Sequence, residues 1–291
     1  MKAELTLDAK TQLGEGSIWD SRIGILWWLD IPGKKLFRFD PKTGENREWA
    51  MPLQVGTVVP RKARGLVLAM ENGFSFFDPE TETFEPIVDP ESDIPTNRFN
   101  DGKCDPAGRF WAGTMAMKGE RQGKGSVYCL YPDQTVQKKI SQVSVSNGIC
   151  WSLDASTLYY IDSPTRRVDA YTFDNETGEI SEQRTAIEIP EGTGMPDGMT
   201  MDENGNLWVA QWGGYRVACY NPNTGKQEEQ IDIPTGSVTS CAFGGDSLET
   251  LYVTTASTGF DDEKWQAEPH GGGLFEAQPG VKGIPAFCYE G

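Results

Sequence analysis

Six short, aromatic-rich apolar segments recur along the chain at nearly equal intervals, and this repetition restricts the fold more than any other feature of the sequence. The segments are "ILWWLD", "GLVLAM", "RFWAGT", "TLYYID", "NLWVAQ" and "TLYVTT". One apolar anchor in each gives successive steps of 40, 44, 48, 49 and 44 residues between Leu26, Leu66, Phe110, Leu158, Leu207 and Leu251. A period of this size indicates one supersecondary unit per repeat.

Each repeat contains further strand-like runs. A second run such as "KLFRFD" or "RVACYN" follows every anchor, and in four repeats a turn such as "DPKTGE" or "NPNTGK" comes directly after it. These turns are typical of β-hairpins, because Asp, Asn and Gly tolerate the backbone angles that tight turns need. Another run precedes most anchors. The pattern therefore predicts an all-β protein, a six-bladed β-propeller with four-stranded antiparallel blades.

The repeats leave no linker, so we expect a single propeller domain over residues 1–291. The first repeat starts near Gly16, which leaves the segment "KAELTLDA" unassigned. We expect this segment to be the outer strand of the last blade, because that pairing closes the ring and removes an open sheet edge. A β-sandwich array is the competing arrangement, but it would not explain six nearly equal periods.

The net charge and the lack of long apolar runs argue against some classes of function. The net charge is −17, from 26 basic and 43 acidic residues, and this argues against a nucleic-acid partner or an anionic membrane surface, which need clustered Lys and Arg. No apolar run approaches the roughly 18 residues of a membrane helix, and the first residues lack an apolar signal core. We expect a cytoplasmic protein, with a monomer as the default state.

Cysteine and histidine usage argues against several kinds of site. None of the six cysteines forms a CxxC pair, so buried free thiols are favoured over a zinc site or a disulfide framework. The one histidine, His270, lies in the polar segment "EPHGGG" and is interpreted as a loop residue. Catalysis by a Ser-His-Asp triad, or a histidine zinc site, would have to depend on that single residue.

The repeat register selects a set of candidate metal ligands. Counting back ten or eleven residues from each anchor reaches Glu15, Val55, Asn100, Asn147, Asp197 and Ser240. Equivalent positions on the innermost strands should converge on the central channel. Glu15, Asn147 and Asp197 are each followed by glycine ("GEG", "SNG", "PDG"), which lets the backbone pack closely and exposes its neighbour. Each residue taken singly also fits an ordinary turn, and only their shared register favours a common site.

The chemistry of this set indicates a divalent cation. Two carboxylates brought together repel each other unless a cation lies between them. Glu, Asp and Asn offer oxygen donors, which suit a hard ion such as Ca²⁺, Mg²⁺ or Mn²⁺ better than a thiolate-type zinc site. The sequence therefore predicts one divalent metal ion, held by Glu15, Asn147 and Asp197.

Four longer motifs resemble a known family. They are "LGEGSIWD", "NRFNDGKCDPAGRFWAGTM", "SNGICWSLDASTLYYIDS" and "MPDGMTMDENGNLWVAQWGG", and in this order and spacing they resemble the regucalcin (senescence marker protein), gluconolactonase and luciferin-regenerating enzyme family. The similarity covers essentially the whole chain. It implies a six-bladed propeller with a divalent metal in its channel, and many members of the family hydrolyse sugar lactones.

The resemblance also implies residue roles. It places the metal on Glu15, Asn147 and Asp197, the set that the register selects, and it places Arg98 and Asn100 of "NRFNDG" against substrate hydroxyls. The chain departs from the family a few positions after "GTMA", where some animal members carry an acidic residue and this chain has "GTMAMKGE". Lys118 in that segment is a weaker candidate substrate contact, and its charge leaves the sugar preference open.

We therefore expect a metal-dependent hydrolase that opens a sugar lactone to the aldonic acid, with Asp197 as the catalytic base because no histidine is available. Ca²⁺ is the first expectation for the ion, with Mn²⁺, Mg²⁺, Zn²⁺ and Fe²⁺ as alternatives. One rival is a phosphotriester or fluorophosphate hydrolase using the same metal site, and another is a non-catalytic calcium-binding propeller. An inward polar set beside Arg98 and Asn100 favours an enzyme over a scaffold.

Overall fold

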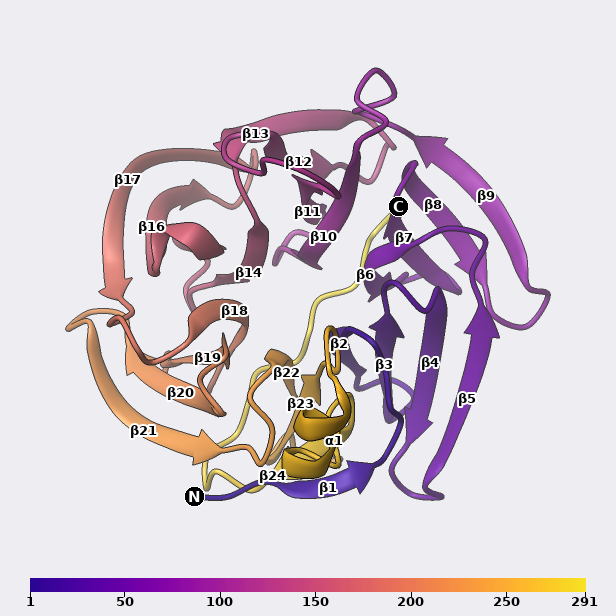
Figure 1. Ribbon diagram of the computed structural model, residues 1–291. Helices are drawn as coiled ribbons and strands as arrows, with labels where there is room; N and C mark the ends of the chain where they lie inside the picture. Colours follow the sequence, from indigo (N-terminus) through magenta and orange to yellow (C-terminus); the bar gives the residue numbers. More distant parts are fainter.

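Six four-stranded antiparallel sheets form a ring around a central channel in the computed structural model, which describes residues 1–291 (Figure 1). This confirms the predicted six-bladed propeller. In the first five blades the strands follow the chain from the channel outward. The sixth blade has the order β22-β23-β24-β1, so its outer strand comes from the opposite end of the chain.

Each blade contributes four strands, in order from the channel to the rim. Blades one to three are β2 (Gly14–Asp20), β3 (Ile25–Asp30), β4 (Lys35–Asp40), β5 (Glu45–Ala50); β6 (Val55–Pro60), β7 (Leu66–Met70), β8 (Gly73–Asp78), β9 (Thr83–Val88); and β10 (Asn97–Cys104), β11 (Phe110–Ala116), β12 (Gly125–Leu130), β13 (Val136–Val143). Blades four to six are β14 (Ser146–Trp151), β15 (Thr157–Asp162), β16 (Arg167–Asp174), β17 (Glu179–Glu188); β18 (Met195–Met201), β19 (Leu207–Trp212), β20 (Arg216–Asn221), β21 (Lys226–Asp232); and β22 (Val238–Gly244), β23 (Thr250–Thr255), β24 (Leu274–Ala277), β1 (Glu4–Leu7).

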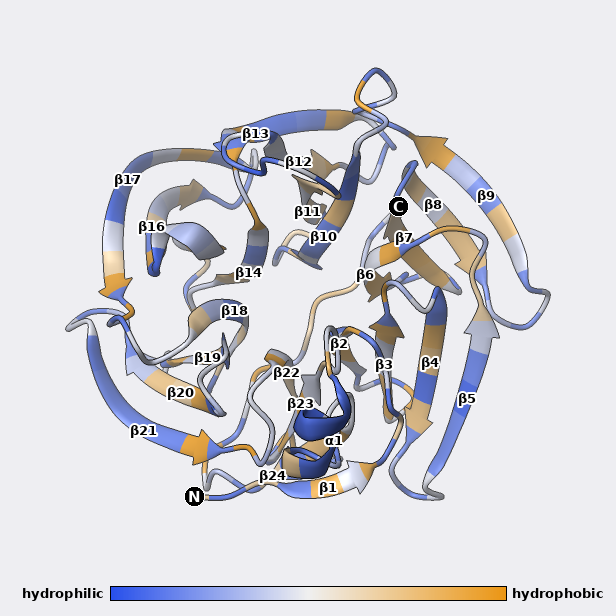
Figure 2. Cartoon of the chain, viewed as in Figure 1, coloured by the Kyte–Doolittle hydropathy of each residue, from blue (hydrophilic) through white to orange (hydrophobic).

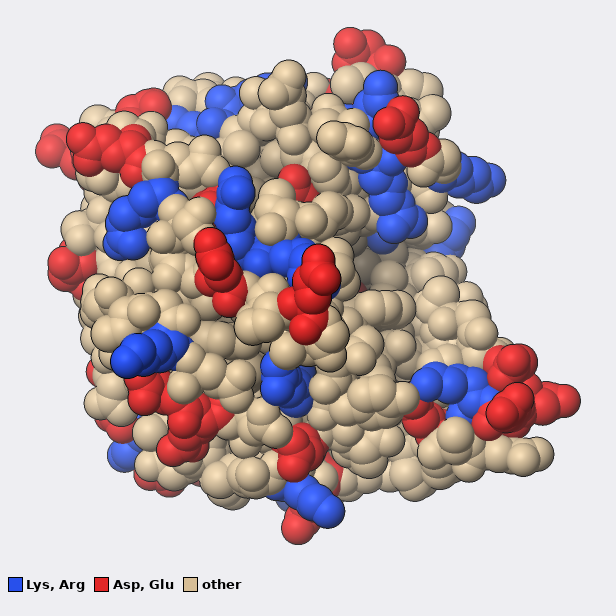
Figure 3. Space-filling model, turned by 60° about the vertical axis from the view of Figure 1, so that its left-hand side comes forward, with Lys and Arg blue, Asp and Glu red and all other residues tan.

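Side chains become more polar and more exposed from the second strand of a blade to its outer strand at the rim. The second strand of each blade is almost entirely buried, whereas outer strands such as β5, β13 and β21 carry mostly exposed polar side chains (Figure 2). Charged side chains on an outer strand discourage pairing with a second sheet edge. On the face shown in Figure 3, acidic side chains lie among basic ones without a continuous basic patch.

The apolar core lies between the blades and not in the channel. Its largest cluster joins blades one, two and three, and four smaller clusters join neighbouring blades around the rest of the ring. Trp28, Trp111 and Trp208 are completely buried in these contacts. Burial of a large apolar side chain contributes about 1.5 to 3 kcal/mol, so the blade faces hold the ring together. The channel is thereby left to polar side chains.

Helices are a minor part of the fold. The α-helix α1 (Asp262–Ala267) is capped by Asp261, whose side chain accepts a hydrogen bond from the Lys264 amide at 2.8 Å. A short 3₁₀ turn, η1 (Ser163–Thr165), follows β15. Neither element was predicted from the repeats. No helix has the length and apolar character needed to span a membrane.

The last residues of the chain cover one end of the channel. Ile284–Phe287 lie against the ends of the inner strands at Trp19, Cys104 and Phe243. The Tyr289 amide donates to the Pro60 carbonyl at 2.9 Å, and the Glu290 amide donates to the Gly108 carbonyl at 3.0 Å. Figure 1 shows this segment passing behind the ring toward blades two and three. The beginnings of the inner strands lie at the other end.

The cysteines form no disulfide. Five of them are buried and Cys288, in the C-terminal segment, is half-buried. His270 is half-exposed in a loop, with Nδ1 3.4 Å from the Asp8 carboxylate, and it lies outside the cavity described below.

Candidate active site

Every inner strand has a break in its pairing register at the level of the predicted site. The breaks lie between Glu15 and Ile18, Val55 and Thr57, Phe99 and Gly102, Ser146 and Ile149, Pro196 and Met199, and Val238 and Ser240. A bulge re-aims the side chains beside it, because the extra residue is released from the ladder. The same irregularity therefore recurs in all six blades, at the positions that the register selects.

The glycines after two of these positions allow the inner strands to approach one another. A Cβ atom on Gly148 would lie 2.8 Å from the Asp197 carbonyl oxygen, and one on Gly198 would lie 2.9 Å from the Ser240 Cα atom. Both distances are too short for a side chain at these positions. In each pair, the acid or amide side chain points into the channel, and the glycine after it allows close contact with the next blade.

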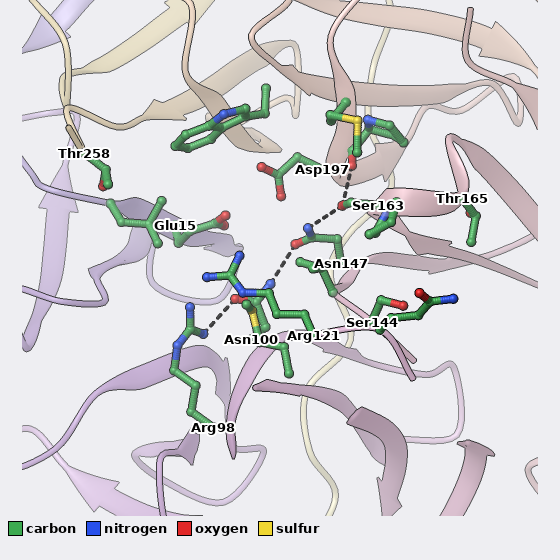
Figure 4. Close-up of a pocket in the computed structure, with 18 residues that line it drawn as sticks. Glu15, Arg98, Asn100, Arg121, Ser144, Asn147, Ser163, Thr165, Asp197 and Thr258 are labelled. Carbon is green, nitrogen blue, oxygen red and sulfur yellow. Dashed lines mark hydrogen bonds between the residues drawn. The ribbon is translucent and has the colours of Figure 1, made fainter. Parts of the chain in front are cut away.

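A cavity of about 840 Å³ opens at the end of the channel where the inner strands begin. Glu15, Asn147 and Asp197 line it from blades one, four and five, and Arg98 and Asn100 line it from blade three (Figure 4). All five side chains belong to residues that are at most 9% exposed. The structure therefore brings together the three predicted ligands and two of the three predicted substrate contacts.

A chain of hydrogen bonds orients the amide ligand. Arg98 Nη1 donates to Asn100 Oδ1 at 2.7 Å, and Asn100 Nδ2 donates to Asn147 Oδ1 at 2.9 Å. Asn147 Nδ2 donates in turn to Ser163 Oγ at 2.7 Å, and Ser163 donates to the Pro196 carbonyl at 2.6 Å. These bonds fix which atom of the Asn147 amide is the oxygen. That oxygen keeps one lone pair that is not used within the chain.

The two carboxyl groups lack comparable support. Glu15 Oε2 accepts only the Gly16 amide, at 3.0 Å, and Asp197 Oδ1 is buried without any hydrogen-bond partner. Burial, together with repulsion from Asp101, raises the pKa of Glu15 to about 8. Burial and the charges of Glu15 and Asp101 raise the pKa of Asp197 well above its usual range. Both groups are therefore poorly stabilised as anions by the protein alone.

This donor set fits a hard divalent cation. No group of three or more His, Cys, Asp or Glu side chains gathers in a metal-binding arrangement, and the set consists instead of two carboxylates and one amide. A cation stabilises buried carboxylates that have no other partners, and oxygen donors of this kind are those of Ca²⁺, Mg²⁺ or Mn²⁺. The orphaned Asp197 oxygen is the observation that supports this assignment.

Sequence reasoning missed a third buried carboxylate in the channel. Asp101 follows Asn100 in the same bulge and is 5% exposed, with Oδ1 accepting the Gly102 amide at 2.7 Å. Burial raises the pKa of this carboxyl, and the nearby Lys103 ammonium opposes that effect. The signal was present in "NDG", which has the same acid-glycine form as "PDG". Asp101 adds negative charge near the ligands without lining the cavity.

The predicted contact at Lys118 is not part of the cavity. Lys118 is exposed on the loop between β11 and β12, which turns at Gly119, where φ is +76°. The same loop places Arg121 and Gln122 on the cavity wall. The basic residue on the cavity wall lies three positions after the predicted one, because loop conformation carries no repeat register.

Together these features define a six-bladed propeller with an oxygen-donor site at the open end of its channel. The profile of the SMP-30/gluconolactonase/LRE-like region matches residues 13–257, and the chain belongs to this family.

Individual relatives match over their full length. Regucalcin of Xenopus laevis is 40% identical over 296 residues, covering 100% of this chain and 99% of that protein. A Bacillus subtilis (strain 168) protein that is provisionally named a sugar lactone lactonase is 40% identical over 291 residues, with 100% and 99% coverage. The crystal structure of a calcium-binding protein, regucalcin, from Agrobacterium tumefaciens superposes with a TM-score of 0.94 at 30% identity, covering 100% of this chain and 97% of that one.

Proposed function

We propose that this protein is a metal-dependent lactonase that opens a sugar lactone to the aldonic acid. The observation that supports this proposal is the pairing of two under-stabilised carboxyl groups, Glu15 and Asp197, with an oriented amide, Asn147, in a cavity large enough for a sugar ring. The family names that include gluconolactonase, and the relative named for sugar lactones, agree with this choice of substrate class.

Glu15, Asn147 and Asp197 are the residues that would hold the ion, Ca²⁺ first and Mn²⁺, Mg²⁺, Zn²⁺ or Fe²⁺ as alternatives. When bound, the ion supplies Lewis-acid stabilisation of the negative charge that develops on the lactone carbonyl oxygen. Glu15 and Asp197 supply the negative charge that holds it, and the neighbouring Asp101 adds to that charge.

Arg98 and Asn100 position the sugar ring. Both line the cavity beside Asn147. The Arg98 guanidinium donates to Asn100, and the Asn100 amide donates to the Ser146 carbonyl, so both side chains are held in place. Directional donors on a rigid strand fix the ring so that its carbonyl carbon meets the attacking water. At the mouth of the cavity the basic contact is Arg121 and not Lys118, since only Arg121 lines the wall.

Asp197 is the proposed general base. Its buried environment makes the carboxylate more basic than an exposed aspartate, and no histidine lines the cavity. Asp197 takes the proton of the attacking water as the new C–O bond forms. The proton then passes to the ring oxygen as the ester C–O bond breaks, which yields the hydroxy acid.

The test is hydrolysis of a panel of aldono-lactones by chelator-treated protein, followed by addition of Ca²⁺, Mn²⁺, Mg²⁺, Zn²⁺ or Fe²⁺ one at a time. We expect at least one lactone to open well above the buffer rate only after a metal is restored. Binding of Ca²⁺ with no hydrolysis of any lactone would favour the calcium-binding propeller instead. Hydrolysis of a phosphotriester or fluorophosphate in place of every lactone would favour the other hydrolase.

A further inference from the structure

Two arginines line the cavity, the buried Arg98 and the exposed Arg121, and neither forms an ion pair. Arg98 Nη1 donates to the Phe99 carbonyl at 2.8 Å and to Asn100 Oδ1, but its Nε and Nη2 atoms make no hydrogen bond. The Arg121 side chain makes neither a hydrogen bond nor an ion pair, although it lines the cavity. Figure 4 shows the Arg121 side chain reaching from its loop toward the space between Glu15 and Asn147.

The charges of the cavity wall favour an anion once a cation is present. The charged residues that line it are Glu15, Asp197, Arg98 and Arg121, which balance one another. Among the side chains that line the wall, a divalent ion on the two carboxylates therefore leaves a surplus of two positive charges, which the buried Asp101 carboxylate behind the wall partly offsets. This surplus stands out in a chain whose net charge is −17. Focusing of such a field in a cleft raises the local concentration of anionic ligands.

The positive charge of Arg121 acts on the buried Arg98 guanidinium. Burial, and to a smaller extent the charge of Arg121, lower the pKa of Arg98 to about 10, while Glu15 opposes this effect. Arg98 is thus protonated at neutral pH, at a cost that an anion between the two arginines would relieve. A guanidinium offers paired N–H donors that match a carboxylate or phosphate group.

A neutral sugar would not need this arrangement. Sugar hydroxyls can be bound by uncharged donors and acceptors, and the cavity wall already supplies them from Asn100, Gln122, Ser144, Thr165 and Thr258. Arg98 is assigned to the sugar ring, so Arg121 is the cationic side chain that is an addition to that set. It indicates a second recognition element on the ligand, apart from the lactone carbonyl.

Resting on the proposed lactonase function, we propose that the preferred substrate is a lactone that carries an anionic substituent, a carboxylate or a phosphate, and that Arg121 is the residue that selects it. Arg98 would contribute from the buried side of the cavity, where it also orients Asn100. The lactone ring and the anionic group would then be bound by different parts of the wall.

The test compares Arg121→Gln with wild type on three lactones at saturating metal: D-glucono-1,5-lactone, its 6-phosphate, and D-glucaro-1,4-lactone. We expect kcat/KM for at least one charged lactone to fall about 10- to 100-fold, the range for a hydrogen bond to a charged group. The neutral lactone should change less than about threefold. The phosphate and the carboxylate arms distinguish the two sources of charge.

Lys124→Gln is the matched control, because Lys124 is an exposed cation on the same loop that does not line the cavity. It should leave all three rates unchanged. Equal losses on neutral and charged lactones in Arg121→Gln, or wild-type preference for the neutral lactone, would overturn the proposal.

A binding measurement separates failure of this inference from failure of the lactonase proposal. Calorimetric titration of metal-loaded protein with glucarate, 6-phosphogluconate and gluconate does not depend on turnover. We expect Arg121→Gln to weaken the binding of glucarate or 6-phosphogluconate about 10-fold or more, and to change the binding of gluconate little. If no lactone is opened but this difference persists, the anion site stands and the hydrolase is wrong. If lactones are opened and the difference is absent, the anion site is wrong.

Discussion

Asp105 and Asp197 are both buried aspartates in the same fold, yet their surroundings are opposite. Asp105 lies in the hairpin turn after β10 and accepts hydrogen bonds from the Ala107 and Arg109 amides, from Arg109 Nε at 2.5 Å and from Trp111 Nε1 at 2.9 Å. Asp197 lies in a bulge at the channel, and one of its oxygens has no partner.

The repeat makes this contrast systematic. Asp202 of blade five occupies the turn equivalent to Asp105, and it accepts the Asn204 and Asn206 amides at 2.9 Å and Trp208 Nε1 at 3.0 Å. Burial alone therefore does not mark a functional acid. A turn carboxylate is buried together with several donors, whereas Glu15 accepts one hydrogen bond and Asp197 Oδ1 accepts none, so only the channel carboxylates leave a place for a partner from outside the chain.

The largest expected effect is at Asp197. Asp197→Asn removes the proposed base, so kcat/KM for a lactone should fall about 10³-fold, within the range of general-base catalysis. The metal-free variant should be at least as stable as wild type in urea, because a poorly solvated carboxyl has been removed. Asp202→Asn, in the same blade, is the matched control: it should lose stability and keep kcat/KM within about threefold. Full activity in Asp197→Asn would remove the assigned base.

Asp105→Asn should reduce stability and leave activity unchanged, which is the reverse of the outcome expected for Asp197→Asn. It leaves Arg109, a residue that is 3% exposed, without its anion, and we expect a loss of about 3 kcal/mol in the free energy of unfolding. Activity per folded molecule should be unchanged. The double variant Asp105→Asn, Arg109→Gln should recover part of the loss in urea unfolding. A variant as stable as wild type would show that this turn does not depend on the ion pair.

The channel acids should also give the metal-free protein an unusual pH dependence. The folded-state pKa of Glu15, about 8, lies above its ordinary value of 4.5, so the folded state binds more protons than the unfolded state between these values. Stability is then highest below about pH 4.5 with respect to this group and falls as pH rises toward 8. In chelator, we expect a loss on the order of 2 kcal/mol between pH 6 and 8. Glu15→Gln should reduce that slope, and saturating metal should abolish it in wild type.

A smaller effect is expected at Ser163, which holds the Asn147 amide in place. Ser163→Ala removes the acceptor of Asn147 Nδ2, so the amide oxygen is less well oriented, and we expect cation affinity to fall about 10-fold. Competition with a metal chelator measures this directly. Thr165→Ala, on the same 3₁₀ turn, is the control, because its hydroxyl donates to the Asp162 carbonyl and not to the ligand. Equal affinities in wild type and Ser163→Ala would show that Asn100 alone suffices.

The repeat register could predict the blades and the inward positions because both depend on local periodicity. Glu15, Asn147 and Asp197 each occupy the same place in a repeat, and the structure brings them to one cavity. Their roles stay predictions. Arg121 and Ser163 could not be found in this way, since they lie on connections whose shape differs from blade to blade. The C-terminal segment follows the last repeat, so no periodic signal marked its position across the channel.

The seam in the sixth blade has a consequence for biosynthesis. β1 and β24 lie at opposite ends of the repeats, so the ring cannot close before the last repeat has been made. Blade one also meets blade six at the channel, where the Ser17 and Ser240 hydroxyls lie 3.0 Å apart, two residues from Glu15. Blades four and five, which carry Asn147 and Asp197, can pack together before blade one, which carries Glu15, packs against blade six. The cation site is therefore complete only in the closed ring, and a cation bound there would stabilise the closed ring.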